Sequence, residues 1–130
     1  MSWRWISKQA LLLLHDESLA EHGGGMGLRD EGLLDSALAR PVNLAAYEEP
    51  DAAALAASYG VGVAKNHPFV DGNKRAALLA AGLFLYLNGF RLQATQADTT
   101  LTMLGVAAGE VSEEAFAAWL RSHIAVREKR

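Results

Sequence analysis

The chain has 130 residues, a formal net charge of −3 and a hydrophobic content of 51%. This length fits a single domain, and the apolar content is enough to build one hydrophobic core. The small negative net charge argues against a broad electrostatic contact with nucleic acid. The chain has no cysteine, which excludes disulfides and thiolate metal sites. We therefore expect one domain spanning residues 1–130, with no direct nucleic-acid partner.

The sequence shows no signal for export or for insertion into a membrane. The first residues lack the apolar core and cleavage pattern of a signal peptide. Every long apolar stretch is interrupted by glycine, asparagine or charge well short of a membrane span. These features predict a soluble, cytoplasmic protein without a membrane partner. The basic segment 127–130 is interpreted as a solvated helix end, because cations favour the C-terminus of a helix.

The first part of the chain predicts two helices separated by a glycine-rich loop. Ser7 has the side chain of an N-cap residue, and its helix should run to about His22. The glycines at 23–25 end this helix in a flexible loop. A second helix is expected from about Glu31 to Ala39, because Pro41 follows and proline disfavours a helix interior. The stretch 42–49 is expected to be irregular or at most a short helix.

The remainder of the chain predicts four more helices. Asp51 should cap a third helix that reaches Lys65 or Asn66, and its glycines at 60 and 62 suggest close packing against a neighbour. A fourth helix, about Asn73 to Leu87, is apolar nearly all round and should be the central helix. Further helices are expected at about 97–108 and after a cap at Ser112. The residues 90–92 form a short extended piece, and no alternating stretch is long enough to predict a sheet. The fold class is therefore all-α, a bundle of about six helices.

The segment 67–75, His-Pro-Phe-Val-Asp-Gly-Asn-Lys-Arg, is the most informative part of the chain. It places an imidazole, a carboxylate, an amide and two cations just before and at the start of the expected central helix. The first turn of a helix has unpaired N–H groups and a partial positive charge, so it can bind an anion. Lys74 and Arg75 add full charges, and arginine can bind phosphate oxygens with two hydrogen bonds. The pattern predicts a phosphate site with His67 placed to accept a proton.

Other polar motifs are weaker. The remaining histidines, His15, His22 and His123, read as solvated or core-edge residues, because no spacing or cysteine supports a zinc site. The glycines at 23–25 lack the lysine and hydroxyl of a phosphate-binding P-loop and read as a mobile loop near the site. Arg29 and Asp30 either hold a protein substrate or form an ordinary salt bridge at a helix start, and the sequence leaves both open.

The segment 67–75 resembles the signature of the Fic/Doc family, H-P-F-x-[D/E]-G-N-G-R-x-x-R. Lys74 stands in place of the second glycine of that pattern, and Leu78 stands in place of its second arginine. Both departures are similar to the death-on-curing (Doc) branch, whose pattern reads H-x-F-x-[D/N]-[A/G]-N-K-R. The likeness includes residues 27–38 and 87–89, so it covers almost the whole chain.

The resemblance implies a toxin of a toxin–antitoxin system. Fic relatives commonly transfer AMP from ATP to a protein hydroxyl, whereas Doc-type toxins phosphorylate a threonine of elongation factor Tu and stop translation. The resemblance therefore implies ATP and Mg²⁺ as cofactors, elongation factor Tu as the target and a Phd-type antitoxin as the partner. The chain lacks the inhibitory [S/T]-x-x-x-E-[G/N] helix of many Fic proteins, which agrees with restraint by a separate chain. Two alternatives remain open: AMP transfer (AMPylation) and a non-catalytic partner-binding module.

The two departures bear on which phosphate is transferred. Glycine lets the backbone approach a diphosphate closely, whereas the Lys74 side chain crowds that approach and supplies a point charge. The absence of a second arginine, with Leu78 in its place, removes one phosphate clamp. We infer that the terminal phosphate of ATP, rather than the α-phosphate, is presented to the target hydroxyl.

Within this resemblance His67 is the general base, and Asp71 is a Mg²⁺ ligand or, alternatively, an N-cap of the fourth helix. Asn73 either orients a phosphate or the loop backbone, or forms a simple Asx turn. Phe69 should be a buried anchor, and Pro68 disfavours helical geometry at His67. The expected catalytic residues are His67, Asp71, Lys74 and Arg75. The expected nucleotide-binding residues are Gly72, Asn73, Lys74 and Arg75.

Overall fold

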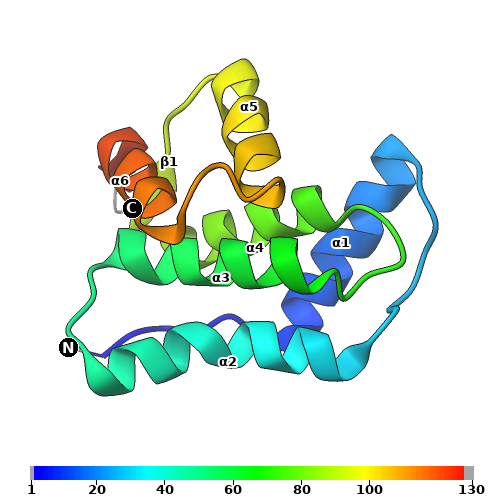
Figure 1. Cartoon of the computed structure of the whole chain (residues 1–130), viewed down its shortest axis with the longest axis horizontal. Coiled ribbons are helices and arrows are strands. Elements are labelled where there is room, and N and C mark those ends of the chain that lie inside the picture. The colour runs from blue at the N-terminus through cyan, green and yellow to red at the C-terminus, as the bar shows by residue number, and fades with distance from the viewer. Residues whose placement is uncertain (1, 128–130) are drawn as a thin grey trace.

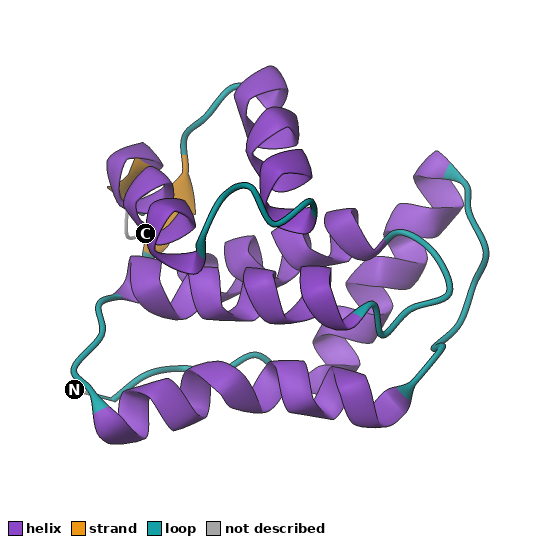
Figure 2. Cartoon of the chain, viewed as in Figure 1, coloured by secondary structure: helices purple, strands orange, loops and turns teal. Residues whose placement is uncertain are grey.

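The computed structural model describes residues 2–127, which form six helices and a two-stranded sheet (Figures 1 and 2). The all-α class and the number of helices are as predicted. In chain order the elements are α1 (Lys8–His22), α2 (Glu31–Tyr47), α3 (Ala52–Asn66), α4 (Asn73–Leu87), β1 (Phe90–Leu92), α5 (Gln96–Ala107), α6 (Glu113–His123) and β2 (Ile124–Val126).

Helices α3 and α4 run side by side through the middle of the bundle, and both contribute to one hydrophobic core (Figure 1). Helix α2 lies along one side of α3, and α5 and α6 lie on the other side. The predicted burial of α4 holds for its apolar face, but α3 is enclosed more completely, with residues 55–64 buried throughout. Helix α1 crosses α4 near the turn that joins α3 to α4.

The two glycines of α3 explain how its neighbours come so close. A Cβ added at Gly60 would lie 2.8 Å from a ring carbon of Phe116 in α6. A Cβ added at Gly62 would lie 3.3 Å from the backbone of Ala37 in α2. Both distances are too short for an ordinary contact, so the glycines permit the close packing that the sequence predicts.

Helix α2 is longer than predicted. It continues through Pro41 to Tyr47, so the expected end near Ala39 and the irregular stretch 42–49 are wrong. Proline removes one backbone N–H and costs about 3 kcal/mol in a helix interior. Here the Pro41 ring is buried, and Leu44 and Ala45 beyond it pack against the core. Tertiary packing therefore outweighs the local preference of the proline.

Residues 90–92 are extended as predicted, but the small sheet to which they belong was not predicted. Strand β1 pairs with β2 in antiparallel register, with Phe90 opposite Val126 and Leu92 opposite Ile124. Helix α6 ends at His123, and Arg127 follows β2 instead of ending a helix. The expected helix end at 127–130 is therefore wrong for Arg127, and residues 128–130 lie outside the described chain. Strands of three residues carry no recognisable alternation, and their partners are far apart in sequence.

The corner at Asn88 and Gly89, just after α4, contacts both ends of the described chain. The Asn88 amide accepts a hydrogen bond from the backbone N–H of Arg4 (2.9 Å) and donates one to the Arg4 carbonyl (3.0 Å). The Gly89 carbonyl accepts a hydrogen bond from the backbone N–H of Arg127 (2.7 Å). The Arg127 guanidinium lies 4.1 Å from the ring centroid of Tyr86. This corner therefore joins the first and last described segments to the end of α4.

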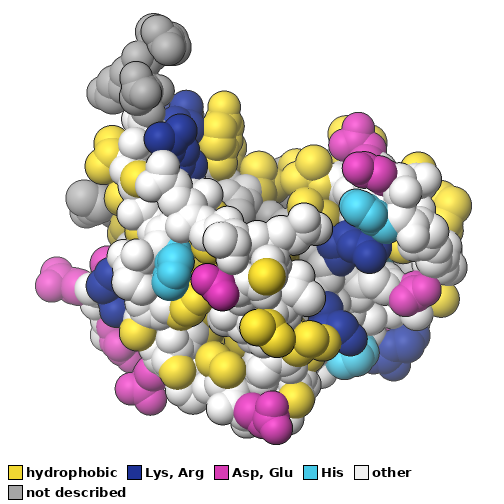
Figure 3. Space-filling view, turned by 90° about the horizontal axis from the view of Figure 1, so that it is seen from above, with side chains coloured by type: hydrophobic (Ala, Val, Ile, Leu, Met, Phe, Trp, Pro, Cys, Tyr) yellow, Lys and Arg dark blue, Asp and Glu magenta, His cyan; other side chains and the backbone are white. Residues whose placement is uncertain are grey.

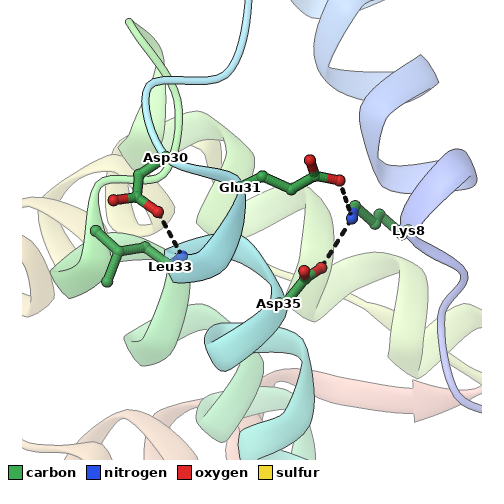
Figure 4. A network of polar contacts seen from close by, with 5 residues as sticks. All are labelled: Lys8, Asp30, Glu31, Leu33 and Asp35. Atoms are coloured by element: carbon green, nitrogen blue, oxygen red, sulfur yellow. Dashed lines mark hydrogen bonds and ion pairs between the residues drawn. The ribbon is translucent and has the colours of Figure 1, made fainter.

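An ion pair network joins the first turns of α1 and α2 (Figure 4). The Lys8 ammonium contacts the carboxylates of Glu31 and Asp35, the latter at 2.9 Å, and these hydrogen bonds raise the pKa of Lys8. The Asp30 carboxylate beside them accepts a hydrogen bond from the Leu33 backbone N–H and so caps α2 (3.0 Å). Exposed pairs of this kind contribute little to stability, but they define where α2 begins relative to α1.

Side chains cap five of the six described helices, and α4 is the exception. The predicted caps Ser7, Asp51 and Ser112 are confirmed, and each accepts a hydrogen bond from the N–H three residues further on. Thr95 and Asp30 do the same for α5 and α2. Helix α4 follows Gly72, which supplies no side-chain cap. Among residues 2–127, no helix has both the length and the apolar character needed to cross a bilayer.

Candidate active site

The turn between α3 and α4 places His67 in an unusual backbone conformation. Its φ and ψ of 49° and 54° lie in the left-handed region, and every other described residue with a positive φ is a glycine. The residue before a proline is disfavoured in the right-handed helical region, so Pro68 contributes to this ending of α3. A left-handed non-glycine residue costs free energy and persists only where its surroundings hold it. The His67 side chain is exposed at the end of α3.

The loop that follows is held by Phe69 and Asn73. Phe69 is buried as predicted, and its ring centroid lies 3.9 Å from that of His15. The Asn73 amide accepts a hydrogen bond from the Phe69 N–H (3.0 Å) and donates one to the Phe69 carbonyl (3.1 Å). Of the alternatives for Asn73, this geometry supports the one in which Asn73 orients the loop backbone, because both polar atoms of its side chain bind the Phe69 backbone.

Asp71 lies at the tip of the loop and does not cap α4. One carboxylate oxygen accepts a hydrogen bond from the N–H of Gly72 (2.8 Å), and the other accepts one from the N–H of Gly25 (3.3 Å). These backbone hydrogen bonds hold the pKa of Asp71 below its ordinary value, and the bond from Gly72 has the larger effect. The group is therefore an exposed, ionised carboxylate, and the alternative of an N-cap is wrong.

The start of α4 leaves backbone donors open. Gly72 has a φ of 75°, and a Cβ at this position would lie 3.0 Å from His15, so only glycine fits without strain. Within the described chain, the backbone N–H groups of Asn73, Lys74 and Arg75 have no protein acceptor. The side chains of Lys74 and Arg75 are exposed beside them. This helix start therefore combines free N–H donors, a dipole end and two cations.

These groups line one open cleft of about 550 Å³, which is within the size range of small-molecule sites. Its lining includes every residue that the sequence predicts for the site, together with two glycines of the 23–25 loop: Gly23, Gly24, His67, Val70, Asp71, Gly72, Asn73, Lys74 and Arg75. Figure 3 shows histidine and Lys or Arg side chains gathered at the end of the molecule where α1, α3 and α4 meet. The arrangement can bind a phosphate group opposite an exposed imidazole.

A second hollow of about 300 Å³ lies between α2, α3 and α6 around Arg40. Its central charge is already paired, because the Arg40 guanidinium donates to Glu113 (2.9 Å) and to the Ser58 carbonyl (3.1 Å). None of the predicted site residues lies in it. The cleft at the start of α4 is therefore the stronger candidate for binding an anion.

The prediction for His15 is wrong, and that for His123 is right. His15 is buried (1% exposed), and neither ring nitrogen has a hydrogen-bond partner in the described chain. Burial lowers the pKa of His15, against the opposing effect of the nearby Asp16 carboxylate. The spacing of Leu11, His15 and Leu19 along one face of α1 is the signal that could have revealed this burial. His123 is half-buried and stacks on Trp119.

Arg29 has a role that neither sequence alternative named. Its guanidinium donates to the backbone carbonyls of His67 (2.7 Å) and Asn66 (2.9 Å), at the C-terminal end of α3. It makes no salt bridge among the described residues. The neighbouring Asp30 caps α2. No local sequence signal links residue 29 to residue 67, because the contact depends on how α2 packs against α3.

The described geometry defines a helical domain in which an exposed histidine and the Asp71 carboxylate share a cleft with an uncapped, cationic helix start. The chain belongs to the Fic/DOC family, whose model matches residues 5–85 and so includes the whole segment 67–75. The Protein kinase doc of Escherichia phage P1 is 39% identical over 119 residues, which cover 91% of this chain and 94% of the phage protein. Toxin Doc of Mycolicibacterium smegmatis is 47% identical over 78 residues, covering 55% of this chain and 57% of that protein.

Proposed function

We propose that the protein is the toxin of a toxin–antitoxin pair and transfers the terminal phosphate of ATP to a Ser or Thr hydroxyl of a protein. One observation carries the proposal: the uncapped start of α4, with Lys74 and Arg75, shares a cleft with His67. The names of the phage and mycobacterial relatives, a protein kinase and a toxin, support the same reading. Elongation factor Tu in the cytoplasm is the favoured target, and a Phd-type antitoxin is the expected partner.

The site residues divide the reaction between phosphate binding and proton transfer. The N–H groups of residues 73–75 and the side chains of Lys74 and Arg75 bind phosphate oxygens. His67 accepts the proton of the target hydroxyl as its oxygen bonds to the terminal phosphorus. The bond from that phosphorus to the bridging oxygen breaks, and ADP leaves. The proton remains on the imidazole until solvent removes it.

Asp71 is suited to hold Mg²⁺ beside the phosphates. Magnesium in nucleotide sites needs one or two carboxylates and completes its shell with phosphate oxygens and water. Asp71 fits this requirement because it is exposed to the cleft and its lowered pKa keeps it ionised. When bound, Mg²⁺ neutralises charge on the phosphate oxygens. The hydrogen bonds from Gly72 and Gly25 direct the carboxylate.

Leu78 and Lys74 support transfer of the terminal phosphate rather than AMP. Leu78 is half-buried in α4 and packs against the core, so no cation takes the place of the second arginine. Lys74 replaces a glycine at the second residue of α4, where it prevents the closest approach of a diphosphate to the backbone. Substituting Lys74→Gly is therefore expected to give some AMP transfer.

The proposal is tested by weighing elongation factor Tu after incubation with the purified protein and Mg-ATP, using intact-protein mass spectrometry and His67→Ala as the control. A gain of one phosphate that is absent with His67→Ala supports the kinase function and its target. A gain of one AMP supports nucleotide transfer instead and overturns the interpretation of Lys74. No modification, together with growth arrest on expression of His67→Ala, would favour a non-catalytic binding module.

A further inference from the structure

The segment before α2 holds the main chain around His67 through four hydrogen bonds. The Arg29 guanidinium donates to the carbonyls of Asn66 (2.9 Å) and His67 (2.7 Å). The backbone N–H groups of Arg29 and Asp30 both donate to the carbonyl of Pro68 (2.7 and 3.0 Å). Three consecutive carbonyls at the end of α3 are therefore bound by two neighbouring residues of a distant segment.

The same segment pairs with the loop beyond Pro68. The Val70 N–H donates to the Gly27 carbonyl (3.0 Å), and Leu28 forms an antiparallel bridge with Phe69. This segment is itself anchored, because Asp30 caps α2 and α2 is tied to α1 through Lys8 (Figure 4). The backbone of Arg29 is therefore held in place by hydrogen bonds on both sides of it.

His67 needs such support because of its conformation. Its left-handed backbone is the only one among the described non-glycine residues, and such a conformation relaxes unless the surroundings restrain it. The imidazole itself has no hydrogen bond within the described chain, so no third group orients it directly. The direction of the side chain is therefore set by the backbone from which it projects.

We propose that Arg29 is a positioning residue that holds the main chain of His67 in the left-handed conformation and so directs its imidazole toward the start of α4. The inference rests on the proposed role of His67 as proton acceptor. Arg29 does not line the cleft, so it acts on the reaction through His67 and not through the nucleotide. A lysine at this position could contact one carbonyl but could not reproduce the planar fork that binds two.

The test compares Arg29→Ala and Arg29→Lys with Arg40→Met, measuring the kcat and the KM for Mg-ATP of transfer to the target protein. Arg40 is a matched control, since its guanidinium also binds a helix carbonyl and lies in the other hollow. We expect kcat of Arg29→Ala to fall about 100-fold, because misplacement of a reacting group by about 1 Å costs that much. The KM for Mg-ATP should change less than about twofold. Arg29→Lys should recover part of the loss, and added guanidinium should restore Arg29→Ala but not His67→Ala.

Three results would overturn the inference. Wild-type kcat in Arg29→Ala would show that the imidazole needs no such support. A raised KM with unchanged kcat would place Arg29 in nucleotide binding. An equal loss of both kcat and thermal stability in Arg29→Ala and Arg40→Met would show that both arginines act only on folding.

A second measurement does not depend on the proposed function. In protein labelled with ¹⁵N-histidine, Arg29→Ala should shift or multiply the His67 backbone and imidazole resonances, while those of His123 on α6 stay in place. Unchanged His67 resonances would overturn the positioning role even if the wild-type protein is an active kinase. Shifted resonances in a protein that transfers nothing would support Arg29 as the holder of His67 and reject the proposed function alone.

Discussion

Helices α4 and α6 begin in opposite ways. Helix α6 starts with Ser112, which caps it, and then has Glu113 and Glu114 in its first turn. Helix α4 starts with Gly72, has no side-chain cap and places Lys74 and Arg75 in its first turn. Acidic residues are favourable at a helix N-terminus and basic residues are unfavourable, typically by 0.3–1 kcal/mol in each case. The start of α6 is therefore arranged for stability, whereas that of α4 is not.

Under the proposed function, the difference marks the place where the molecule gives up stability to bind phosphate. Both helices have the same unpaired N–H groups in their first turn. In α6 the Ser112 hydroxyl accepts a hydrogen bond from one of these groups, the Ala115 N–H, at 3.0 Å. In α4 the corresponding N–H groups have no side-chain acceptor and lie at the cleft. A bound phosphate would supply the cap and the negative charge that α4 lacks. The comparison predicts that substitutions at the two starts affect different properties.

The largest effect is expected from removing the cations of α4. Arg75→Met or Lys74→Met should weaken the binding of Mg-ATP by about 10- to 100-fold, because each removes a hydrogen bond between charged groups. Thermal stability should stay the same or rise slightly, because an unfavourable charge leaves the helix start. Isothermal titration calorimetry measures the affinity, and Lys65→Met, at the end of α3, is the matched control. Unchanged affinity in both α4 variants would contradict the phosphate site.

Gly72→Ala should destabilise the protein by about 1–2 kcal/mol, because alanine is strained at a φ of 75° and its Cβ would press against His15. Gly82→Ala in the same helix is the control, since nothing lies within 4 Å of a Cβ at that position. That variant should gain about 0.5–1 kcal/mol from the better helix propensity of alanine. Urea denaturation compares the two, and equal effects would show that the start of α4 is not specially shaped.

Ser112→Ala should destabilise the protein by about 1 kcal/mol through loss of the α6 cap. Phosphate transfer and nucleotide affinity should remain those of the wild type, because α6 contributes no residue to the cleft. The measurements are urea denaturation and the mass-spectrometric transfer assay. A loss of phosphate transfer in a folded Ser112→Ala protein would contradict the expectation that the start of α6 affects stability alone.

The smallest effect concerns Asp51, the cap of α3, whose pKa is lowered chiefly by hydrogen bonds from Arg121 (2.6 and 3.0 Å). A lowered pKa in the folded state gives stability that is present above the unfolded pKa, about 3.9, and is lost as the pH falls through the folded value. Because the pair is half-exposed, the contribution should be only a few tenths of a kcal/mol. Arg121→Gln should make the loss of stability below about pH 4 shallower in acid titrations. An unchanged acid profile would show that this pair is screened completely.

The features that could be predicted from the sequence are those that neighbouring residues determine. Caps such as Ser7 and Asp51 act within three residues, and the segment 67–75 is contiguous, so its polar residues meet in one cleft. The extent of α2 beyond Pro41 and the pairing of β1 with β2 depend on tertiary contacts, which local preferences do not contain. The role of Arg29 was missed for the same reason, whereas the burial of His15 could have been predicted from its helical spacing with Leu11 and Leu19.

The corner at Asn88 and Gly89 sets the order in which the fold can be completed. It binds Arg4 on one side and Arg127 on the other, so its two sets of hydrogen bonds join segments from nearly opposite ends of the described chain. Closing such long loops carries an entropy cost, so we expect these contacts to form late in folding. A nascent chain cannot complete this corner until the ribosome has added residue 127. Chains interrupted before β2 lack this closure, so premature termination yields an incomplete fold.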